Sequence, residues 1–507
     1  MMDDPELAWV GGGQAVGHGR RIVLAAVVDG DDLEDLGKCG QRVERLCDQR
    51  LDVLGLVVRR EEVGQRGDAP GGDRSRLGHH LRLGGGRHRG SIVGRMAVAP
   101  AVAGAPERAV PGRIAWRSLA VFALLAGGAA VLYWWTGPKP VGLDAFVPLA
   151  DALLHGRLHI IEPMPWIEHV DRVGGGWYVP YPPMPAVSVL PFVAVFGAGF
   201  DQGYAAALMG GLSVGILWEL FGRLGVAPLP RRSLVAAFAL GSVMWWAAGI
   251  GTSWLFAGVN GVFWSLLALW LALDRRWPVV AGLFVGFAAA SRLPVGLTLP
   301  LYLALYAGVE VKPRLGIPDR SKLKDAGLVL LGVAVPAVLV ALYNVARFGS
   351  PIDFGYEKIP GVLAEPWYRD GILSLSYIPR HVHTMFLRGF DFTDGFPWFR
   401  PNWTGLALTF TTPIYFWLVQ LRRRETFVVF GWIAILLALV PIVTHGNVGE
   451  TQFGYRFSLD VAPILWLMLG MLFVRRISLP ARLAILVGIV VHAYGIYVIT
   501  VLDFVSY

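Results

Sequence analysis

The stretch that follows the first long apolar run holds many of the side chains suited to acid–base chemistry. Asp144 comes first, at the water–lipid boundary implied by the end of that run, and Asp171 follows in His169-Val170-Asp171-Arg172. Partial withdrawal from water raises the pKa of a carboxyl group, which makes its carboxylate a better general base. Asp144 is therefore the first candidate for a base, although it also suits the N-cap of a short helix. The remaining ionisable residues of this stretch include Asp151, His155, Glu162 and Glu168.

A short amphipathic helix is predicted to position these groups. It would begin at Asp144 and end at Gly156, and we expect its apolar residues to lie on the bilayer surface. These residues are Phe146, Leu149, Leu153 and Leu154. Polar residues gather again in later stretches that we expect on the same side of the membrane. These stretches contain Thr252-Ser253-Trp254, Ser291-Arg292, Arg347, Asp353, Glu357, Asp391, Asp394, His445, Glu450, Gln452 and Arg456.

The chain as a whole is too apolar for a soluble protein. Of its 507 residues, 55% are hydrophobic and only 16% are charged, and its mean hydropathy is +0.53. Globular domains carry about 25% charged residues. The net charge of +8 comes partly from short Arg clusters between apolar runs, such as Arg275-Arg276, and no basic stripe for nucleic acid is visible. We therefore predict an all-α, polytopic membrane protein without a nucleic-acid partner.

Twelve apolar segments account for the predicted membrane domain, residues 114–507. Most are close to the ~20 residues that a spanning helix needs. They cover residues 116–135, 184–199, 203–222, 233–250, 254–273, 277–290, 293–308, 325–346, 404–421, 427–443, 455–473 and 483–502.

Basic residues in the short loops predict the orientation of these segments. Arg113 and Arg117 place the N-terminus in the cytoplasm, which leaves two long polar loops, 136–183 and 347–403, outside. Two outer loops must be separated by an even number of crossings, yet seven apolar segments lie between them. We expect the short, proline-interrupted segment 184–199 to be re-entrant or interfacial, which gives about eleven crossings and an external C-terminus. The alternative is that 277–290 does not span.

The first 113 residues differ from the rest of the chain. Their apolar runs are too short to span a bilayer, and they contain Cys39 and Cys47, the two cysteines of the chain. We consider a disordered cytoplasmic extension, an over-extended start with Met96 as the true initiator, and a folded domain. N-terminal sequencing of the native protein would distinguish the second from the others.

The order of motifs resembles the GT-C class of bacterial membrane glycosyltransferases, which use polyprenyl-phosphate sugars. A spanning helix is followed by Asp144, then by ADALLHGRL at 150–158 and GWYVPYPPMPA at 176–186. The late segment QFGYRFSLD at 452–460 also resembles bacterial membrane proteins of this type. The resemblance covers about 114–503. It departs from the class at Ala145, because an Asp-Asp or Asp-Glu pair often follows the first helix in these enzymes.

The resemblance implies an inverting transfer of a sugar from a polyprenyl-phosphate donor to a glycan, lipid or protein acceptor. Asp144 would take the proton of the acceptor hydroxyl, and Asp171 would orient the acceptor or bind an ion. Arg292 and Arg456 suit the leaving phosphate, although each also suits a snorkelling interfacial position. Aromatic residues of 176–186 would stack on sugars or form an interfacial belt. The predicted substrate-binding residues are Asp151, His155, Glu168, Trp177, Tyr178, Tyr181, Arg292, Tyr455 and Arg456.

Three further expectations complete the sequence-based hypothesis. No metal site is predicted, because His381 and His383 lack clustered ligands, but a divalent ion is left open as a cofactor. The protein is placed in the plasma (inner) membrane of a bacterium, with its active face outside the cytoplasm. The alternative functions are a transporter or lipid-linked sugar flippase, which would place ionisable residues near the bilayer midplane, and a non-catalytic assembly subunit.

Overall fold

The computed structural model is described for most of the predicted membrane domain. The N-terminal extension, residues 1–113, lies outside the described residues, as do Arg423 and Arg424. The described residues are 116–138, 142–163, 168–312, 314–315, 320–422 and 425–502.

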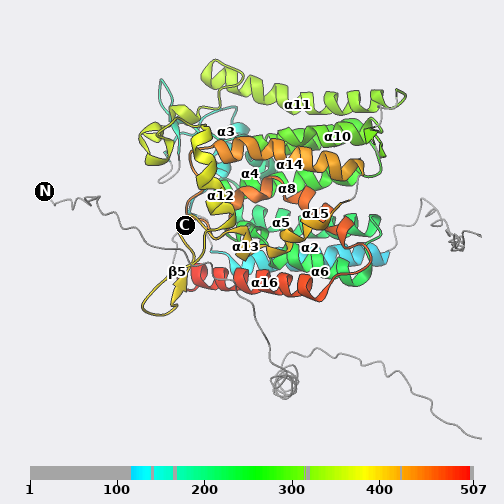
Figure 1. Ribbon diagram of the computed structural model, residues 1–507. Coiled ribbons are helices and arrows are strands. Elements are labelled where there is room, and N and C mark those ends of the chain that lie inside the picture. The colour runs from blue at the N-terminus through cyan, green and yellow to red at the C-terminus, as the bar shows by residue number, and fades with distance from the viewer. Residues whose placement is uncertain are drawn as a thin grey trace, which may run out of the picture. The chain divides into compact units, whose positions relative to one another are not determined.

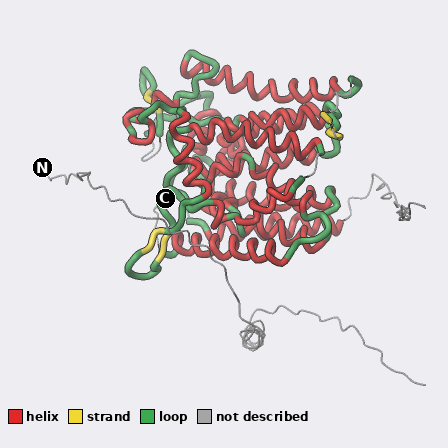
Figure 2. The backbone as a smooth tube through the Cα atoms, viewed as in Figure 1, coloured by secondary structure: helices red, strands yellow, loops and turns green. Residues whose placement is uncertain are grey.

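The described part is a bundle of apolar helices lying side by side, with most connecting loops gathered at its two ends (Figures 1 and 2). Six helices are long and apolar enough to cross a membrane, or seven if α6 and α7, which meet at a 45° bend, form one span. This confirms the predicted polytopic helical architecture. These helices are α2 (Trp116–Thr136), α5 (Gln202–Arg223), α6 (Pro228–Leu240) with α7 (Val243–Ile250), α8 (Ser253–Ala272), α11 (Leu323–Phe348), α14 (Thr426–Thr444) and α16 (Leu479–Thr500).

Four further runs between the two ends are built from shorter pieces. The predicted segment 404–421 differs most from a regular helix, because it forms four residues of α-helix followed by an eight-residue 3-10 helix. These pieces are shorter than the helices that meet the length for a membrane span, so the count of about eleven crossings stays a prediction. They are α9 (Pro278–Ala289), η1 (Leu293–Thr298) with α10 (Leu299–Tyr306), α13 (Leu408–Thr411) with η6 (Pro413–Gln420), and η7 (Arg456–Asp460) with α15 (Ala462–Leu472).

One end of the bundle collects the basic loops. Here the Arg223 guanidinium bonds the Asp274 carboxylate at 3.0 Å, and the Tyr306 hydroxyl donates to the Arg276 carbonyl at 2.6 Å. The Ala227 N–H donates to the Val474 carbonyl at 2.7 Å. These contacts bring loops from distant parts of the sequence together, and we call this side the basic end. The small hairpin of β3 (Val311–Lys312) and β4 (Arg314–Leu315) belongs to the connection between α10 and α11.

The opposite end carries the two long polar loops, and we call it the polar end. Its first loop contains one short helix and one hairpin, and its second contains four 3-10 turns, one helix and one hairpin. The elements are α3 (Phe146–Leu154), β1 (Val170–Asp171), β2 (Trp177–Tyr178), η2 (Tyr356–Lys358), η3 (Val362–Ala364), η4 (Pro366–Tyr368), η5 (Leu375–Tyr377), α12 (Ile378–Phe386), β5 (Asp391–Phe392) and β6 (Phe399–Arg400).

Helix α4 (Met184–Phe196) starts and finishes at the polar end. Its first residue, Met184, donates its N–H to the Ala290 carbonyl at 3.1 Å. The next helix opens with Gln202, whose side-chain amide donates to the Gly251 carbonyl at 2.7 Å. Ala290 and Gly251 both belong to turns at the polar end. The segment 184–199 therefore does not cross the bundle, as the parity of the loops predicted, whereas 277–290 does.

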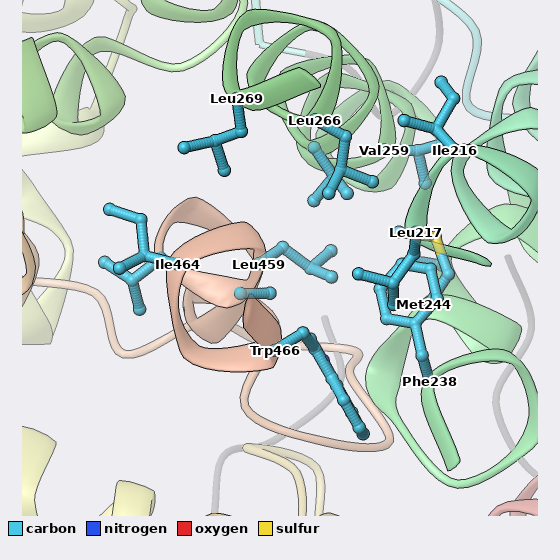
Figure 3. Close-up of a cluster of buried hydrophobic side chains, with 14 of the residues drawn as sticks. Ile216, Leu217, Phe238, Met244, Val259, Leu266, Leu269, Leu459, Ile464 and Trp466 are labelled. Atoms are coloured by element: carbon cyan, nitrogen blue, oxygen red, sulfur yellow. The ribbon is translucent and has the colours of Figure 1, made fainter. Parts of the chain in front are cut away.

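Buried apolar side chains fill the centre of the bundle. Figure 3 shows Leu217, Phe238, Leu266 and Trp466, from α5, α6, α8 and α15, gathered in one cluster. The Phe238 and Trp466 rings meet edge to face with their centroids 5.6 Å apart. Such packing is a main source of helix association in a membrane, where lipid tails are as apolar as the helices.

Helices α9 and α11 approach each other through glycines. A Cβ atom on Gly332 of α11 would stand 2.1 Å from the Val279 carbonyl oxygen and 2.9 Å from the Gly282 Cα atom. A side chain at this position must push the two helices apart. In contrast, a Cβ atom on Gly327 of the same helix would meet nothing within 4 Å.

We expect Gly332→Leu to lower the thermal unfolding midpoint of the detergent-solubilised protein by several degrees, because overpacking costs about 1–3 kcal/mol or more. Gly327→Leu is the matched control and should leave the midpoint unchanged. Equal midpoints for the two variants would contradict the close helix contact.

Candidate active site

Asp144 caps the first helix of the polar end. Its Oδ1 atom accepts hydrogen bonds from the N–H groups of Phe146 and Val147, both at 3.0 Å, which confirms the predicted N-cap role. The prediction that this helix lies on the bilayer surface is wrong for Phe146 and Leu149. Both are fully buried in the main core, where the Phe146 ring contacts the Tyr181 ring. Hydrophobic contact with the protein's own helices thus fixes α3 and, with it, Asp144.

The surroundings of Asp144 favour its protonated form. Burial raises the pKa of the Asp144 carboxyl to about 7, and the negative charge of Asp201 adds to this effect. Hydrogen bonds from the backbone of Val147, Phe146 and Gln202 act in the opposite direction. Asp201 is itself fixed as the N-cap of α5, accepting from the Gly203 N–H at 2.7 Å. The result is a carboxyl group that gains and loses its proton near neutral pH.

Ser253 clamps the backbone on both sides of Asp144. Its hydroxyl donates to the Leu143 carbonyl at 2.9 Å and accepts from the Ala145 N–H at 2.8 Å. The Ser253 N–H also donates to the Leu143 carbonyl at 2.9 Å. Ser253 is fully buried and begins α8. The position of the Asp144 carboxylate therefore depends on a residue more than a hundred positions away in the sequence.

We expect Ser253→Ala to slow the reaction that Asp144 supports by about tenfold, since the loss of one or two hydrogen bonds costs about 1–2 kcal/mol. The unfolding midpoint should also fall by a few degrees, because the buried Ala145 N–H loses its acceptor. Ser265→Ala, another buried serine of α8, is the control and should keep the full rate. A Ser253→Ala protein with unchanged activity would contradict the clamp.

The rings of Tyr181 and Trp254 lie between Phe146, whose N–H group donates to Asp144, and the guanidinium of Arg456. The Tyr181 hydroxyl donates to the Glu168 carboxylate, and the Tyr181 ring lies 6.4 Å from the Trp254 ring and 6.0 Å from the Phe146 ring. On the other side of Trp254, the Arg456 guanidinium carbon lies 5.9 Å from the ring centroid. Because Trp254 follows Ser253 directly, one turn holds the Asp144 backbone and carries the aromatic ring next to Arg456.

Carboxylates surround Arg456 at the polar end. Burial raises the pKa of Glu450; the charges of Glu365 and Glu168 raise it further, and Arg456 lowers it. Arg456 donates from Nη1 to the Glu450 carbonyl at 3.3 Å, and its N–H donates to the Gln452 side chain at 3.2 Å. The predicted residues Glu168, Tyr181 and Arg456 are thus brought together.

Arg292, in contrast, is engaged by Asp460. Its Nε and Nη2 atoms donate to the two carboxylate oxygens of Asp460, both at 3.0 Å. The Asp460 side chain is 1% exposed and the Arg292 side chain 23%, so the carboxylate is shielded from water and the guanidinium is partly accessible. Asp460 thus occupies the Nε–Nη2 edge of the guanidinium, while Nη1 takes no part in these two bonds. This pair joins the turn before η1 to η7. The phosphate contact of Arg292 stays a prediction.

Tyr455 is also committed to the protein interior. Its side chain is fully buried, and its hydroxyl lies 2.7 Å from Nδ1 of His381. Nε2 of His381 lies 2.8 Å from the His445 carbonyl oxygen. Burial lowers the pKa of His381 to about 4, so the ring is neutral at pH 7. This network holds α12 against the 445–457 segment and keeps the Tyr455 side chain inside the protein.

The other predicted residues lie on more peripheral parts of the polar end. Asp171 sits on the β1–β2 hairpin with 73% of its side chain exposed, 4.0 Å from His169. Trp177 contacts the ring of His169, and Tyr178 packs edge to face on Phe348. The structure therefore places Asp171 on an exposed hairpin.

A second peripheral group lies at the last turn of α3. The Asp151 carboxylate is within 3.5 Å of both the His155 ring and the Arg157 guanidinium. These contacts are local along the chain and close the helix.

Sequence reasoning missed Asp201, Gln202 and Ser253 as parts of the Asp144 site. Asp201 and Gln202 open α5, where they read as an ordinary helix start. The side-chain carbonyl oxygen of Gln202 is buried without a hydrogen-bond partner. Among the described residues, no group of three or more His, Cys, Asp or Glu side chains is arranged to hold a metal ion.

The apolar helices and their connections define a polytopic helical membrane protein. No family model matches the chain, and no curated protein matches it. Among solved structures, it is similar to ArnT from Cupriavidus metallidurans bound to undecaprenyl phosphate, with 17% identity, a TM-score of 0.42 and 77% of this chain covered. The apo state of ArnT gives 16% identity, a TM-score of 0.43 and the same coverage. The match spans 66% of the ArnT chain in both cases.

A second protein is also similar to this chain. It is the Archaeoglobus fulgidus oligosaccharyltransferase tethered with an acceptor peptide, with 13% identity and a TM-score of 0.36. The match covers 76% of this chain and 55% of that one.

Proposed function

We propose that this chain is a membrane glycosyltransferase that moves a sugar from a polyprenyl-phosphate donor to an acceptor hydroxyl at the polar end. The observation that carries the proposal is the Asp144 carboxyl, with its pKa raised to about 7 and its backbone clamped by Ser253. A base that titrates near the working pH is well matched to proton abstraction from a hydroxyl. The resemblance of the sequence to the GT-C class supports the same reaction.

The proposed step is a single displacement at the anomeric carbon. Asp144 accepts the proton of the acceptor hydroxyl while the hydroxyl oxygen forms a bond to that carbon. The bond from the anomeric carbon to the phosphate oxygen breaks, and polyprenyl phosphate leaves with the electron pair. One displacement inverts the configuration of the sugar. The phosphate is already a good leaving group, so the step needs no strong general acid.

Arg456 is the cation that we propose for the leaving phosphate. Its guanidinium faces the ring of Trp254, the residue that directly follows the clamping Ser253. A guanidinium offers a planar set of donors to phosphate oxygens and keeps its charge at all relevant pH values. We place Arg292 second in this role, because Asp460 already binds the Nε and Nη2 atoms of its guanidinium.

The orientation follows from the same proposal. We place the basic end in the cytoplasm and the polar end outside, in the plasma membrane of a bacterium, because basic loops are retained on the cytoplasmic side. Single cysteines introduced at Asp171 and Arg231 would test this in intact cells. A membrane-impermeant thiol reagent should label position 171 and spare position 231, and the reverse pattern would overturn the orientation.

The reaction is tested with the purified full-length chain and a radiolabelled polyprenyl-phosphate sugar. We expect label to pass to an added glycan, lipid or peptide acceptor while polyprenyl phosphate is released in equal amount. A parallel sample with EDTA shows whether a divalent ion takes part. Failure of transfer with every acceptor, together with uptake of the sugar lipid into protein-containing vesicles, would favour a transporter or flippase and overturn the proposal.

A further inference from the structure

An apolar cleft lies on the side of the basic end of the bundle. Its volume is about 300 Å³, and its walls come from α2, α5 and α6. Helices α2 and α6 both pack on α5, which forms the floor between them. The lining residues are Leu124, Leu125, Gly128, Ala129, Leu132, Val214, Trp218, Arg232, Val235, Ala236, Ala239 and Leu240.

Small side chains keep the cleft open. A Cβ atom on Gly128 would meet nothing within 4 Å, so helix packing does not require glycine there. Glycine inside a helix costs about 1 kcal/mol relative to alanine. Ala129 and Ala236 likewise leave room where larger residues would fill the gap. Glycine at position 332 is explained by the close approach of another helix backbone, whereas glycine at position 128 is not.

Different contacts flank the two ends of the cleft. Toward the middle of the bundle, the buried Tyr133 hydroxyl donates to the Ala239 carbonyl at 2.9 Å and bridges α2 to α6. At the basic end, Glu219 accepts from the Ser118 hydroxyl at 3.1 Å and lies 3.9 Å from Arg231. Arg231 also stacks on Trp218, with its guanidinium carbon 3.7 Å from the ring centroid.

Arg232 is the one charged residue among those that line the cleft. Its side chain is exposed, and among the described residues it makes no ion pair or hydrogen bond. The neighbouring cation, Arg231, is held by Trp218 and Glu219, so the two arginines differ in availability. The apolar cleft thus has one available positive charge, on the side of the basic end.

We propose that this cleft binds an anionic glycerophospholipid, with one acyl chain between α2 and α6 and the phosphate on Arg232. The cleft runs along α6 from Arg232 to Leu240, about 12 Å at the helical rise. Half of the hydrocarbon core measures about 15 Å, so the cleft is long enough for most of one acyl chain. A straight acyl chain suits the narrow volume, and a phosphate accepts charge-assisted hydrogen bonds from a guanidinium. The proposal is independent of the proposed glycosyl transfer.

Native mass spectrometry of the full chain in detergent, titrated with phosphatidylglycerol or phosphatidylcholine, tests this site. We expect phosphatidylglycerol to bind saturably with one molecule per chain and about tenfold more tightly than phosphatidylcholine. Arg232→Gln should remove this preference, whereas Arg232→Lys should keep most of it. Arg475→Gln, which removes another exposed cation near the basic end, is the matched control and should change nothing.

A second set of variants tests the apolar part of the cleft. Gly128→Leu should weaken binding of both lipids by filling the space, and Gly128→Ala, which adds only one methyl group, should have a smaller effect. Equal binding of the two lipids, or a phosphatidylglycerol preference that persists in Arg232→Gln, would overturn the proposal. So would displacement of phospholipid by a polyprenyl phosphate that binds more tightly, because the cleft would then be a carrier-lipid site.

Discussion

Asp144→Asn should reduce the rate of sugar transfer by about a thousandfold, within the 10²–10⁴ range that a positioned general base contributes. Asparagine keeps the size of the side chain, and its carbonyl oxygen still accepts from the Phe146 and Val147 N–H groups. It cannot take a proton from the acceptor. The initial rate with radiolabelled polyprenyl-phosphate sugar, measured beside the thermal unfolding midpoint, gives the result.

Stability and rate should move independently in this variant. The raised pKa of Asp144 means that the folded protein resists ionisation of this carboxyl, so a neutral amide should leave the unfolding midpoint at pH 8 unchanged or higher. Asp151→Asn is the matched control, since Asp151 lies on the same helix and caps no backbone N–H group at the site. Transfer that survives in Asp144→Asn, or is lost equally in Asp151→Asn, would end the role of Asp144 as the base.

Removal of one partner of the Arg292–Asp460 pair should destabilise the protein by about 3–5 kcal/mol, because the remaining charge is buried without compensation. Asp460 is 1% exposed, and both of its oxygens accept from Arg292. Arg292→Met and Asp460→Leu should therefore each lower the unfolding midpoint strongly. Thermal unfolding in detergent, followed by light scattering, measures the loss.

The double variant separates the ion pair from a role in catalysis. Arg292→Met with Asp460→Leu should recover much of the stability, since an apolar pair of similar volume avoids the desolvation of two charges. If Arg292 only joins η1 to η7, the double variant should also recover transfer activity. A stable double variant without activity would instead restore Arg292 to the predicted phosphate site.

The helices were largely predictable because each depends on local hydrophobicity. The predicted segment 203–222 corresponds to Gln202–Arg223, and 325–346 corresponds to Leu323–Phe348. The N-cap role of Asp144 was also predictable, because a cap depends on the residue and its immediate successors. The expectation that segment 184–199 does not cross came from the bias of basic residues toward cytoplasmic loops, applied to the whole chain.

The partners of the site residues were not predictable, because they come from distant segments. Ser253 reaches Asp144 from the start of α8, and Asp460 reaches Arg292 across 168 residues of sequence. A surface helix and a buried helix also share one amphipathic pattern, which is why α3 was assigned to the bilayer surface. Only the packing of Phe146 against the core distinguishes them.

The pH dependence of transfer tests the role of Asp144 most directly. The carboxyl must be ionised to act as a base, and its pKa is raised to about 7. In the wild-type protein, the logarithm of kcat/KM should therefore rise with pH at a slope of one up to about pH 7 and level off above it. The residual activity of Asp144→Asn should lack this limb. An identical acidic limb in both proteins would show that another group is the base and would contradict the proposed mechanism.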